Sequence, residues 1–359
     1  MIRALIIGSA SIDFELDKQG NYIQPFLQSL ARQDIQPVSE LPFDAIIAIN
    51  HNSKSLKKAL VSFGRKDPCI LIRTEPDSVF PAQYTQRVEG KYNFVFTIGR
   101  PKVESDKFLN FPHPYWIEEN PNTPNYAGLD KKELFINVEN FRLEDWLKRS
   151  IFVSLVAANK VSSTKTNNYK LRRDMATTAK LGSLEVFGGL WRDKFFTKAK
   201  HRLGVLLHAI RNRTVPNLSS IWGGLFIVTS NYKGSPANKQ DVISKSKYSL
   251  VIENSNSYVS EKLFDAMVGG SIPIYFGPQL SLFGIDEKDL LIRHDGSFED
   301  LHSMLKNISI EEVLRRLRAI HSFLVSKYFQ DTWLMPNVNG RIAECIHDCL
   351  ASLLENNSK

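Results

Sequence analysis

The segment Lys247–Pro278 reads KYSLVIENSNSYVSEKLFDAMVGGSIPIYFGP and has the layout of a strand, a loop, a helix, a turn and a second strand. Its apolar run at Tyr248–Ile252 predicts a buried strand, because short apolar runs bounded by polar residues are typical of strands. Ser260 can cap the helix that follows, and a glycine pair ends this helix before the strand Ile272–Phe276. The layout indicates an α/β protein with neighbouring parallel strands.

Apolar runs of strand length alternate with helical stretches along most of the chain. They predict strands at Ala4–Gly8, Ala45–Ile49, Cys69–Ile72, Phe94–Ile98, Ile151–Ala157 and Leu184–Phe187. This alternation is typical of a parallel, doubly wound sheet. Residues 115–145 are rich in proline and asparagine and interrupt it, so we place a domain boundary near Arg149. The length of 359 residues also fits about two domains of roughly 150 residues each.

Polar side chains begin where the strand Tyr248–Ile252 ends. Ligands of open α/β sheets bind beyond the carboxyl ends of strands, and a helix N-terminus there attracts anions. Lys262 lies in the first turn of the predicted helix, where a cation is unfavourable unless an anion is bound. We therefore expect Lys262 and the helix amides to bind a diphosphate. Other polar side chains of this loop can meet hydroxyls of a ribose or sugar: Glu253, Asn254, Tyr258 and Glu261. An ordinary surface loop is the alternative left open.

The same segment resembles the donor-site signature of the α1,3/4-fucosyltransferases, over the pattern ENS-x(2)-YVSEKLFDAMVGGSIPIYFGP. Ser260 stands where that family usually has threonine and keeps the hydroxyl. Val251-Ile252 stand where the family often has Cys-Phe or Ala-Phe, and the loop before Tyr258 is slightly shorter. The resemblance implies the GT-B architecture, in which two Rossmann-like doubly wound domains face each other across a cleft. Residues 1–148 would bind the acceptor, 149–335 the nucleotide-sugar, and 336–359 would form a C-terminal helix.

The resemblance continues upstream of this segment. Phe152-Val-Ser154 with Asn159 resembles the strand that opens the donor domain of the family. The family also has an arginine that contacts the donor diphosphate, about fifteen residues before a V-x-x-G-G turn. Either Arg172 or Arg173 fits that place, and the spacing leaves both open. Together with Ser260 and the loop residues above, they complete the expected donor-binding set.

Glu75 is the expected catalytic base. An inverting transfer needs a group that takes the proton of the acceptor hydroxyl as it attacks. Glu75 follows the strand Cys69–Ile72 and precedes Pro76, so it is presented from a turn at the carboxyl end of a strand. The resemblance implies the same role. A turn carboxylate paired with Arg73 is the alternative, and the next candidate carboxylates are Glu118 and Glu119.

The resemblance implies an inverting α1,3/4-fucosyltransferase. It would move fucose from GDP-fucose to a hydroxyl of an N-acetylglucosamine-type or related sugar in a bacterial-type surface glycan. We expect no cofactor and no catalytic metal, because the sequence has no clear Asp-x-Asp pair and cationic side chains can neutralise the leaving diphosphate. Two alternatives stay open: a transferase of the same fold with another nucleotide-sugar donor, and a non-catalytic relative that binds sugar or nucleotide.

Positive charge is concentrated in one part of the chain. The net charge is +8, and residues 191–214 carry seven lysines and arginines against Asp193 alone. No nucleic-acid-binding motif accompanies them, so we expect no nucleic-acid partner. Within an insert at about 190–240, apolar residues among the cations predict an amphipathic helix that can lie on an anionic membrane: Leu203, Val205, Leu206, Leu207 and Ile210. A helix packed on the domain, with one solvated face, is the alternative.

The N-terminal residues Met1–Gly8 lack the features of a signal peptide, and no run reaches the roughly 18 apolar residues of a membrane span. We therefore expect a cytoplasmic protein that contacts the inner face of the membrane peripherally, where a lipid-linked glycan acceptor would be found. The three cysteines are Cys69, Cys345 and Cys349, and their odd number argues against a disulfide framework.

Overall fold

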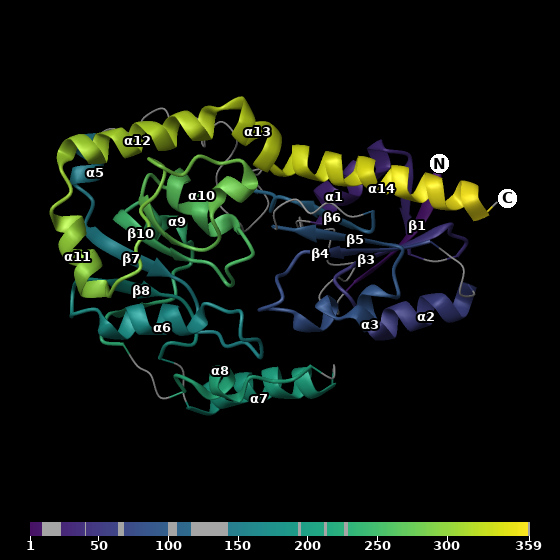
Figure 1. Ribbon diagram of the computed structural model, residues 1–359, viewed down its shortest axis with the longest axis horizontal. Coiled ribbons are helices and arrows are strands. Elements are labelled where there is room, and N and C mark those ends of the chain that lie inside the picture. The colour runs from purple at the N-terminus through teal and green to yellow at the C-terminus, as the bar shows by residue number, and fades with distance from the viewer. Residues whose placement is uncertain are drawn as a thin grey trace.

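A computed structural model describes residues 1–8, 23–39, 41–63, 68–99, 106–115, 143–192, 195–211, 214–225 and 229–357. Within them, two parallel β-sheets lie side by side, and helices pack around each (Figure 1). The expected α/β class with two doubly wound sheets is confirmed.

The first sheet has the strand order β2-β1-β3-β4-β5-β6, and all neighbouring strands are parallel. The strands are β1 (Ile2–Gly8), β2 (Ile35–Val38), β3 (Ala45–Ile49), β4 (Cys69–Arg73), β5 (Phe94–Ile98) and β6 (Phe108–Phe111). The helical elements of this half are α1 (Ile23–Arg32), α2 (Ser53–Phe63), the 3-10 turn η2 (Pro81–Tyr84) and α3 (Gln86–Glu89). Strands β3 and β4 are buried along their whole length, which explains their uninterrupted apolar sequences.

The second sheet has the order β11-β10-β7-β8-β9 and is also parallel throughout. Its strands are β7 (Ile151–Val156), β8 (Glu185–Phe187), β9 (Tyr232–Gly234), β10 (Ser246–Ile252) and β11 (Ile272–Phe276). The chain starts in the middle of this sheet, at β7, moves outward to β9 and then returns to β10 on the other side of β7. The strand order therefore reverses between β7 and β10. A crevice forms at the carboxyl ends of two strands that flank such a reversal.

Helices cover the second sheet and continue beyond it. They are α5 (Leu143–Leu147), α6 (Tyr169–Thr178), α7 (Phe195–Arg211), α8 (Leu218–Trp222), α9 (Gln240–Ile243), α10 (Glu261–Val268), the 3-10 turn η3 (Leu280–Phe283), α11 (Phe298–Lys306), α12 (Ile310–Val325) and α13 (Lys327–Trp333). Among the described residues, no helix is both long enough and apolar enough to cross a bilayer.

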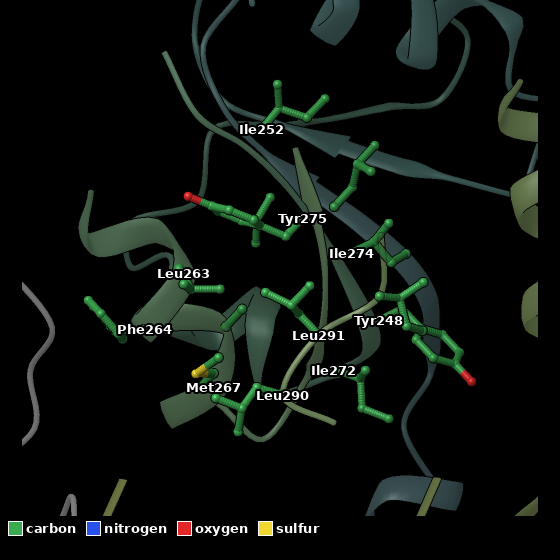
Figure 2. Close-up of a cluster of buried hydrophobic side chains, with 14 of the residues drawn as sticks. Tyr248, Ile252, Leu263, Phe264, Met267, Ile272, Ile274, Tyr275, Leu290 and Leu291 are labelled. Carbon is green, nitrogen blue, oxygen red and sulfur yellow. The ribbon is translucent and has the colours of Figure 1, made fainter. Parts of the chain in front are cut away.

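The core of the second half forms where α10 packs against β10 and β11 (Figure 2). Leu263, Phe264 and Met267 of α10 are fully buried together with Ile272 and Ile274 of β11. The apolar side of α10 thus faces the sheet, and its first turn is left at the sheet's carboxyl edge. The strand, loop, helix, turn and strand expected for 247–278 are confirmed.

The last helix, α14 (Met335–Asn357), leaves the second half and packs on the first sheet next to α1 (Figure 1). Its buried side chains Val338, Ile342 and Ile346 share one core cluster with Leu30 of α1 and Ile47 of β3. The strands β1–β6 and the last helix therefore belong to the same half of the molecule.

Candidate active site

A cavity of about 410 Å³ lies between the two halves, at the carboxyl ends of both sheets. The first half lines it with residues that follow β4 and β6, among them Thr74, Glu75, His113 and Pro114. The second half lines it with residues that follow β7 and β10, and with the first turn of α10: Ala157, Ala158, Lys160, Asn254, Tyr258, Ser260, Glu261 and Lys262. Ligands of open α/β sheets bind at this edge of the strands.

Ser260 and Glu253 hold the first turn of α10 in place. The Ser260 hydroxyl accepts a hydrogen bond from the Lys262 backbone N–H at 3.4 Å. The Ser260 backbone N–H and hydroxyl donate to the Glu253 carboxylate at 2.8 and 2.6 Å. Glu253 is fully buried, and the Tyr275 hydroxyl also donates to it, at 3.5 Å. Glu253 is not among the residues that line the cavity; its hydrogen bonds to Ser260 fix the α10 N-terminus.

Four cationic side chains line the cavity: Lys160, Arg172, Lys239 and Lys262. Lys262 Nζ donates to the Ser260 hydroxyl at 2.9 Å and lies 3.5 Å from the Glu253 carboxylate. Lys239 forms an ion pair of 2.6 Å with the buried Asp265. Of the four, sequence reasoning missed Lys160 and Lys239. The available signal for Lys160 was its place directly after the strand that resembles the opening of a donor domain.

Arg172 joins the two loops that flank the reversal of strand order. Its guanidinium donates to the carbonyl of Ile252 at 2.8 Å, to the carbonyl of Ala158 at 3.3 Å and to the side chain of Asn254 at 3.2 Å. Burial lowers the pKa of Arg172. The side chain therefore fixes the shape of the crevice between β7 and β10 while lining it.

Arg173 is directed elsewhere. It is only 3% exposed, and its guanidinium donates to the backbone carbonyl of Lys160 at 3.2 Å. It is absent from the cavity lining and lies near Gly223, just after α8. Of the two arginines that the sequence left open, the structure brings Arg172 to the cavity.

Glu75 belongs to the first half and faces the cations of the second half across the cavity. Its side chain stays accessible to solvent, but the cleft walls surround it. This desolvation, and then the negative charge of Glu261, raise the pKa of Glu75, whereas Lys160 and Lys262 act in the opposite direction. Glu75 is thus a cavity carboxylate with an upward pKa shift, which makes it a stronger base than an ordinary glutamate.

The turn that carries Glu75 is fixed through its backbone. The Glu75 carbonyl accepts hydrogen bonds from the Gln83 side chain at 3.1 Å and the Tyr84 hydroxyl at 2.8 Å. Arg73, the alternative partner suggested by the sequence, pairs with Glu89 instead. Glu118 and Glu119, the other candidate bases, lie outside the described residues.

Glu261 is the ionised carboxylate of the cavity. Burial acts to raise its pKa, but Lys262, His113 and Lys239 outweigh burial and hold the pKa at about 2. His113 Nε2 lies 4.0 Å from the Glu261 carboxylate, and burial lowers the pKa of His113 below its ordinary value. Burial also raises the pKa of Asp265 to about 6. Glu261 therefore supplies the negative charge that acts on Glu75 at neutral pH.

Tyr258 lines the cavity and also joins the two halves. Its hydroxyl donates to the Thr74 carbonyl at 3.1 Å, and the neighbouring Val259 N–H donates to the Gly99 carbonyl at 2.9 Å. Gly99 has a φ of +78°, and a Cβ atom there would lie 2.5 Å from the Tyr258 ring. This glycine is thus required for both its backbone conformation and the close approach of the ring.

In the described part of the chain, no three histidine, cysteine, aspartate or glutamate side chains gather in a group that could hold a metal ion. The polar groups that line the cavity include the four cations, several carboxylates and the first turn of α10. A helix N-terminus with nearby cations suits a phosphate or diphosphate.

No protein-family model and no curated protein matches this chain. Solved structures do match. A crystal structure of an α1,3-fucosyltransferase superimposes with a TM-score of 0.56 and 17% identity, over 99% of this chain and 90% of that one. The chain has the GT-B architecture. An α1,3-fucosyltransferase with GDP-fucose gives a TM-score of 0.53 at 15% identity, over 99% and 90% of the two chains. HepE of Anabaena in complex with UDP gives 0.50 at 10% identity, over 97% and 100%.

Proposed function

We propose that this GT-B protein is an inverting glycosyltransferase that moves fucose from GDP-fucose to a sugar hydroxyl without a catalytic metal. One observation carries the proposal: Glu75 of the first half faces four cations and the α10 N-terminus of the second half within a single cavity. A base on one side and an anion-binding wall on the other are the two requirements of an inverting transfer from a nucleotide-sugar.

The roles follow from these positions. Glu75 takes the proton of the acceptor hydroxyl while the hydroxyl oxygen attacks the anomeric carbon of the donor. The bond between that carbon and the diphosphate oxygen breaks, and the nucleoside diphosphate leaves with the bonding electrons. Lys262 and the α10 amides, with Lys160 beside them, stabilise the negative charge on the leaving group. Asn254 and Glu261, which line the cavity, are the residues that we propose to bind hydroxyls of the donor.

Two observations support fucose as the transferred sugar. The segment 247–278 resembles the donor signature of the α1,3/4-fucosyltransferases. The fold resembles that of an α1,3-fucosyltransferase crystallised with GDP-fucose. For the acceptor we propose an N-acetylglucosamine-type or related sugar of a surface or lipid-linked glycan. A donor based on UDP is the second candidate, because HepE of Anabaena, of similar fold, was crystallised with UDP.

A nucleotide panel tests the donor. We expect GDP to raise the melting temperature, since a ligand at 100 times its Kd adds about 2.7 kcal/mol to the stability of the native state. GDP-fucose should then be hydrolysed, or transferred when acceptor sugars are supplied. A shift with UDP alone would replace the fucosyl assignment by a UDP-sugar transferase. Binding of GDP-fucose without any turnover on a broad acceptor panel would favour the non-catalytic relative.

Removal of divalent cations tests the chemistry of the leaving group. We expect turnover to persist in excess chelator, because the cavity neutralises the diphosphate with lysine and arginine side chains. Loss of turnover on chelation, with recovery on addition of manganese, contradicts this part of the proposal.

A further inference from the structure

Helix α7 packs on the second half through its cations. Lys198 and Arg202 are 3% and 0% exposed. Lys198 Nζ donates to the Trp191 carbonyl at 2.9 Å, and the Arg202 guanidinium donates to the carbonyl of Gly223 at 3.3 Å. The side of α7 that carries Lys198 and Arg202 therefore faces the protein, and the opposite side faces outward. Helix α7 is thus packed on the domain, as the alternative expected.

The outward side of α7 and α8 is apolar. Large apolar side chains of the two helices, and of Val215 between them, are between 41% and 94% exposed: Phe196, Leu203, Leu207, Ile210, Val215, Leu218 and Trp222. We call this set the α7–α8 face. The two helices lie outside both sheets, below α6 in the view of Figure 1. A gathering of exposed large apolar side chains marks an interaction surface on a soluble protein.

The segment that contains this face is strongly basic. Residues 186–240 contain nine lysines and arginines and only one acidic residue, Asp193, so this segment accounts for the whole net charge of +8. Helices α7 and α8 contain no acidic residue. Lys200 and Arg211 are exposed on α7, beside the apolar side chains. An apolar helix face bordered by cations is the composition that binds the interface of anionic lipids.

The face is attached to the loop that lines the cavity. The Asn217 N–H, at the start of α8, donates to the Ser163 carbonyl at 2.8 Å, and the Asn167 side chain donates to the Ser220 hydroxyl at 3.0 Å. The same loop, which follows β7, supplies Ala158 and Lys160 to the cavity wall. A partner that binds to α7 and α8 would therefore lie close to the cavity.

We propose that the α7–α8 face docks the protein on an anionic lipid surface, with the apolar side chains at the level of the headgroups and the cations on lipid phosphates. A purely polar, acidic partner surface would pair with the cations but leave the apolar side chains in water. The inference goes beyond the proposed transfer reaction, because docking requires neither nucleotide nor acceptor.

Trp222 provides a direct test. It is 41% exposed on α8, whereas Trp146, Trp191 and Trp333 are buried. With vesicles of phosphatidylcholine containing a quarter phosphatidylglycerol, we expect lipids brominated on the acyl chains to quench the fluorescence of the wild-type protein. The part of the quenching that comes from Trp222 should be lost in Trp222→Phe, which keeps an apolar ring. Trp116, which lies outside the described residues, is present in both proteins. Binding with no difference in quenching between the two proteins overturns the proposed orientation.

Co-sedimentation with the same vesicles separates apolar from charged contributions. We expect Phe196→Ser with Leu207→Ser to weaken binding at least tenfold. Lys200→Gln with Arg211→Gln should weaken it about 25-fold at low salt, since each cation near an anionic surface contributes about fivefold. The matched control is Val61→Ser with Ile310→Ser, two exposed apolar side chains of α2 and α12. It should bind like the wild type.

Three results overturn the proposal. The first is a wild-type protein that stays unbound to these vesicles at low salt. The second is an equal loss of binding in the control pair. The third is a dimer in sedimentation equilibrium that dissociates in Phe196→Ser with Leu207→Ser, because the face would then join two copies of the chain. GDP binding should be unchanged in every variant, so failure of docking and failure of the proposed transferase are distinguishable.

Discussion

At Glu75, base catalysis and ligand binding can be separated by one substitution. Glu75→Gln keeps the shape and the hydrogen bonding of the side chain and removes its capacity to take a proton. We expect kcat to fall by about 10²–10⁴-fold. The Kd of GDP should stay within about twofold, because Glu75 belongs to the half opposite the cations. Steady-state kinetics and a GDP titration on the same preparation measure both.

Lys262→Ala is the counterpart on the other side of the cavity. Lys262 lies in the first turn of α10 and lines the cavity, so its removal should weaken GDP binding and also lower kcat. In a GDP titration, Glu75→Gln should therefore bind like the wild type, whereas Lys262→Ala should bind more weakly. A Glu75→Gln enzyme with near-normal turnover rules out Glu75 as the base.

The pH dependence of activity should report the charge on Glu261. The pKa of Glu75 is raised, so Glu75 keeps its proton up to a higher pH than an ordinary glutamate. Because a base must be unprotonated, kcat/KM should fall as the pH drops through this raised pKa. Glu261→Gln removes the second-largest cause of the shift, so the acidic limb should move to lower pH. Burial, the largest cause of the shift, remains in this variant.

The acidic limb is read from a pH profile of kcat/KM. Its position on the pH axis does not depend on the absolute activity, which Glu261→Gln should also lower. Glu311→Gln, at the exposed start of α12, is the control of equal charge change and should leave the limb in place. An acidic limb at the same pH in Glu261→Gln and wild type contradicts the coupling between the two carboxylates.

Individual site residues differ in how far the sequence could locate them. Glu75, Asn254 and Lys262 lie in motifs at strand ends, and the structure brings them to one cavity. Lys239 comes from a loop far along the chain and reaches the cavity through its ion pair with Asp265, a contact that no local pattern encodes.

The N-cap residue of α10, Ser260, has two roles. Its hydroxyl caps the helix and also donates a hydrogen bond to a buried carboxylate. Ser260→Ala should cost about 1 kcal/mol for the cap. It also removes the hydroxyl that donates to the fully buried Glu253, which should add about 1–3 kcal/mol. Urea denaturation measures the total loss in the free energy of unfolding.

Ser309 of α12 is the matched control for this substitution. Its hydroxyl accepts from the Glu312 N–H at 3.2 Å, and the residue is exposed. Ser309→Ala should therefore cost only the cap, about 1 kcal/mol. Equal losses in Ser260→Ala and Ser309→Ala would show that Glu253 is satisfied without the Ser260 hydroxyl.

The strands with uninterrupted apolar sequences could be predicted, whereas the short edge strands could not. Strands β3, β4, β10 and β11 are buried on both faces and read as apolar runs. Strand β2 has four residues including Pro37, which an edge position tolerates, and β9 has three. Helix α7 was expected from its composition, but which side it buries depends on the hydrogen bonds of Lys198 and Arg202 to distant carbonyls.

The two halves are held together near the cavity by the contacts of Tyr258 and Val259. Gly99→Ala should disturb them, because the new methyl group would lie 2.5 Å from the Tyr258 ring. It also forces alanine into a left-handed conformation, which costs about 1–2 kcal/mol by itself. We expect a lower melting temperature and a weaker affinity for GDP, since Tyr258 precedes the first turn of α10.

Gly182→Ala isolates the backbone contribution. Gly182 has a φ of +83°, and a Cβ atom there would meet nothing within 4 Å. The variant should therefore lose about 1–2 kcal/mol of stability and keep its affinity for GDP. If Gly99→Ala and Gly182→Ala prove equivalent in both measurements, the ring contact does not contribute to the junction of the halves.

Because α14 packs on the first sheet, the first half of the molecule cannot complete its core until the end of the chain has been synthesised. The last strand of that sheet, β6, ends at Phe111, whereas α14 begins at Met335. A ribosome adding about 5–20 residues per second needs roughly 10–50 s to make the chain between them. Throughout that time the apolar surface that Val338, Ile342 and Ile346 will cover is without its helix. The half made first is therefore completed last, and the nascent chain depends on chaperones most in that interval.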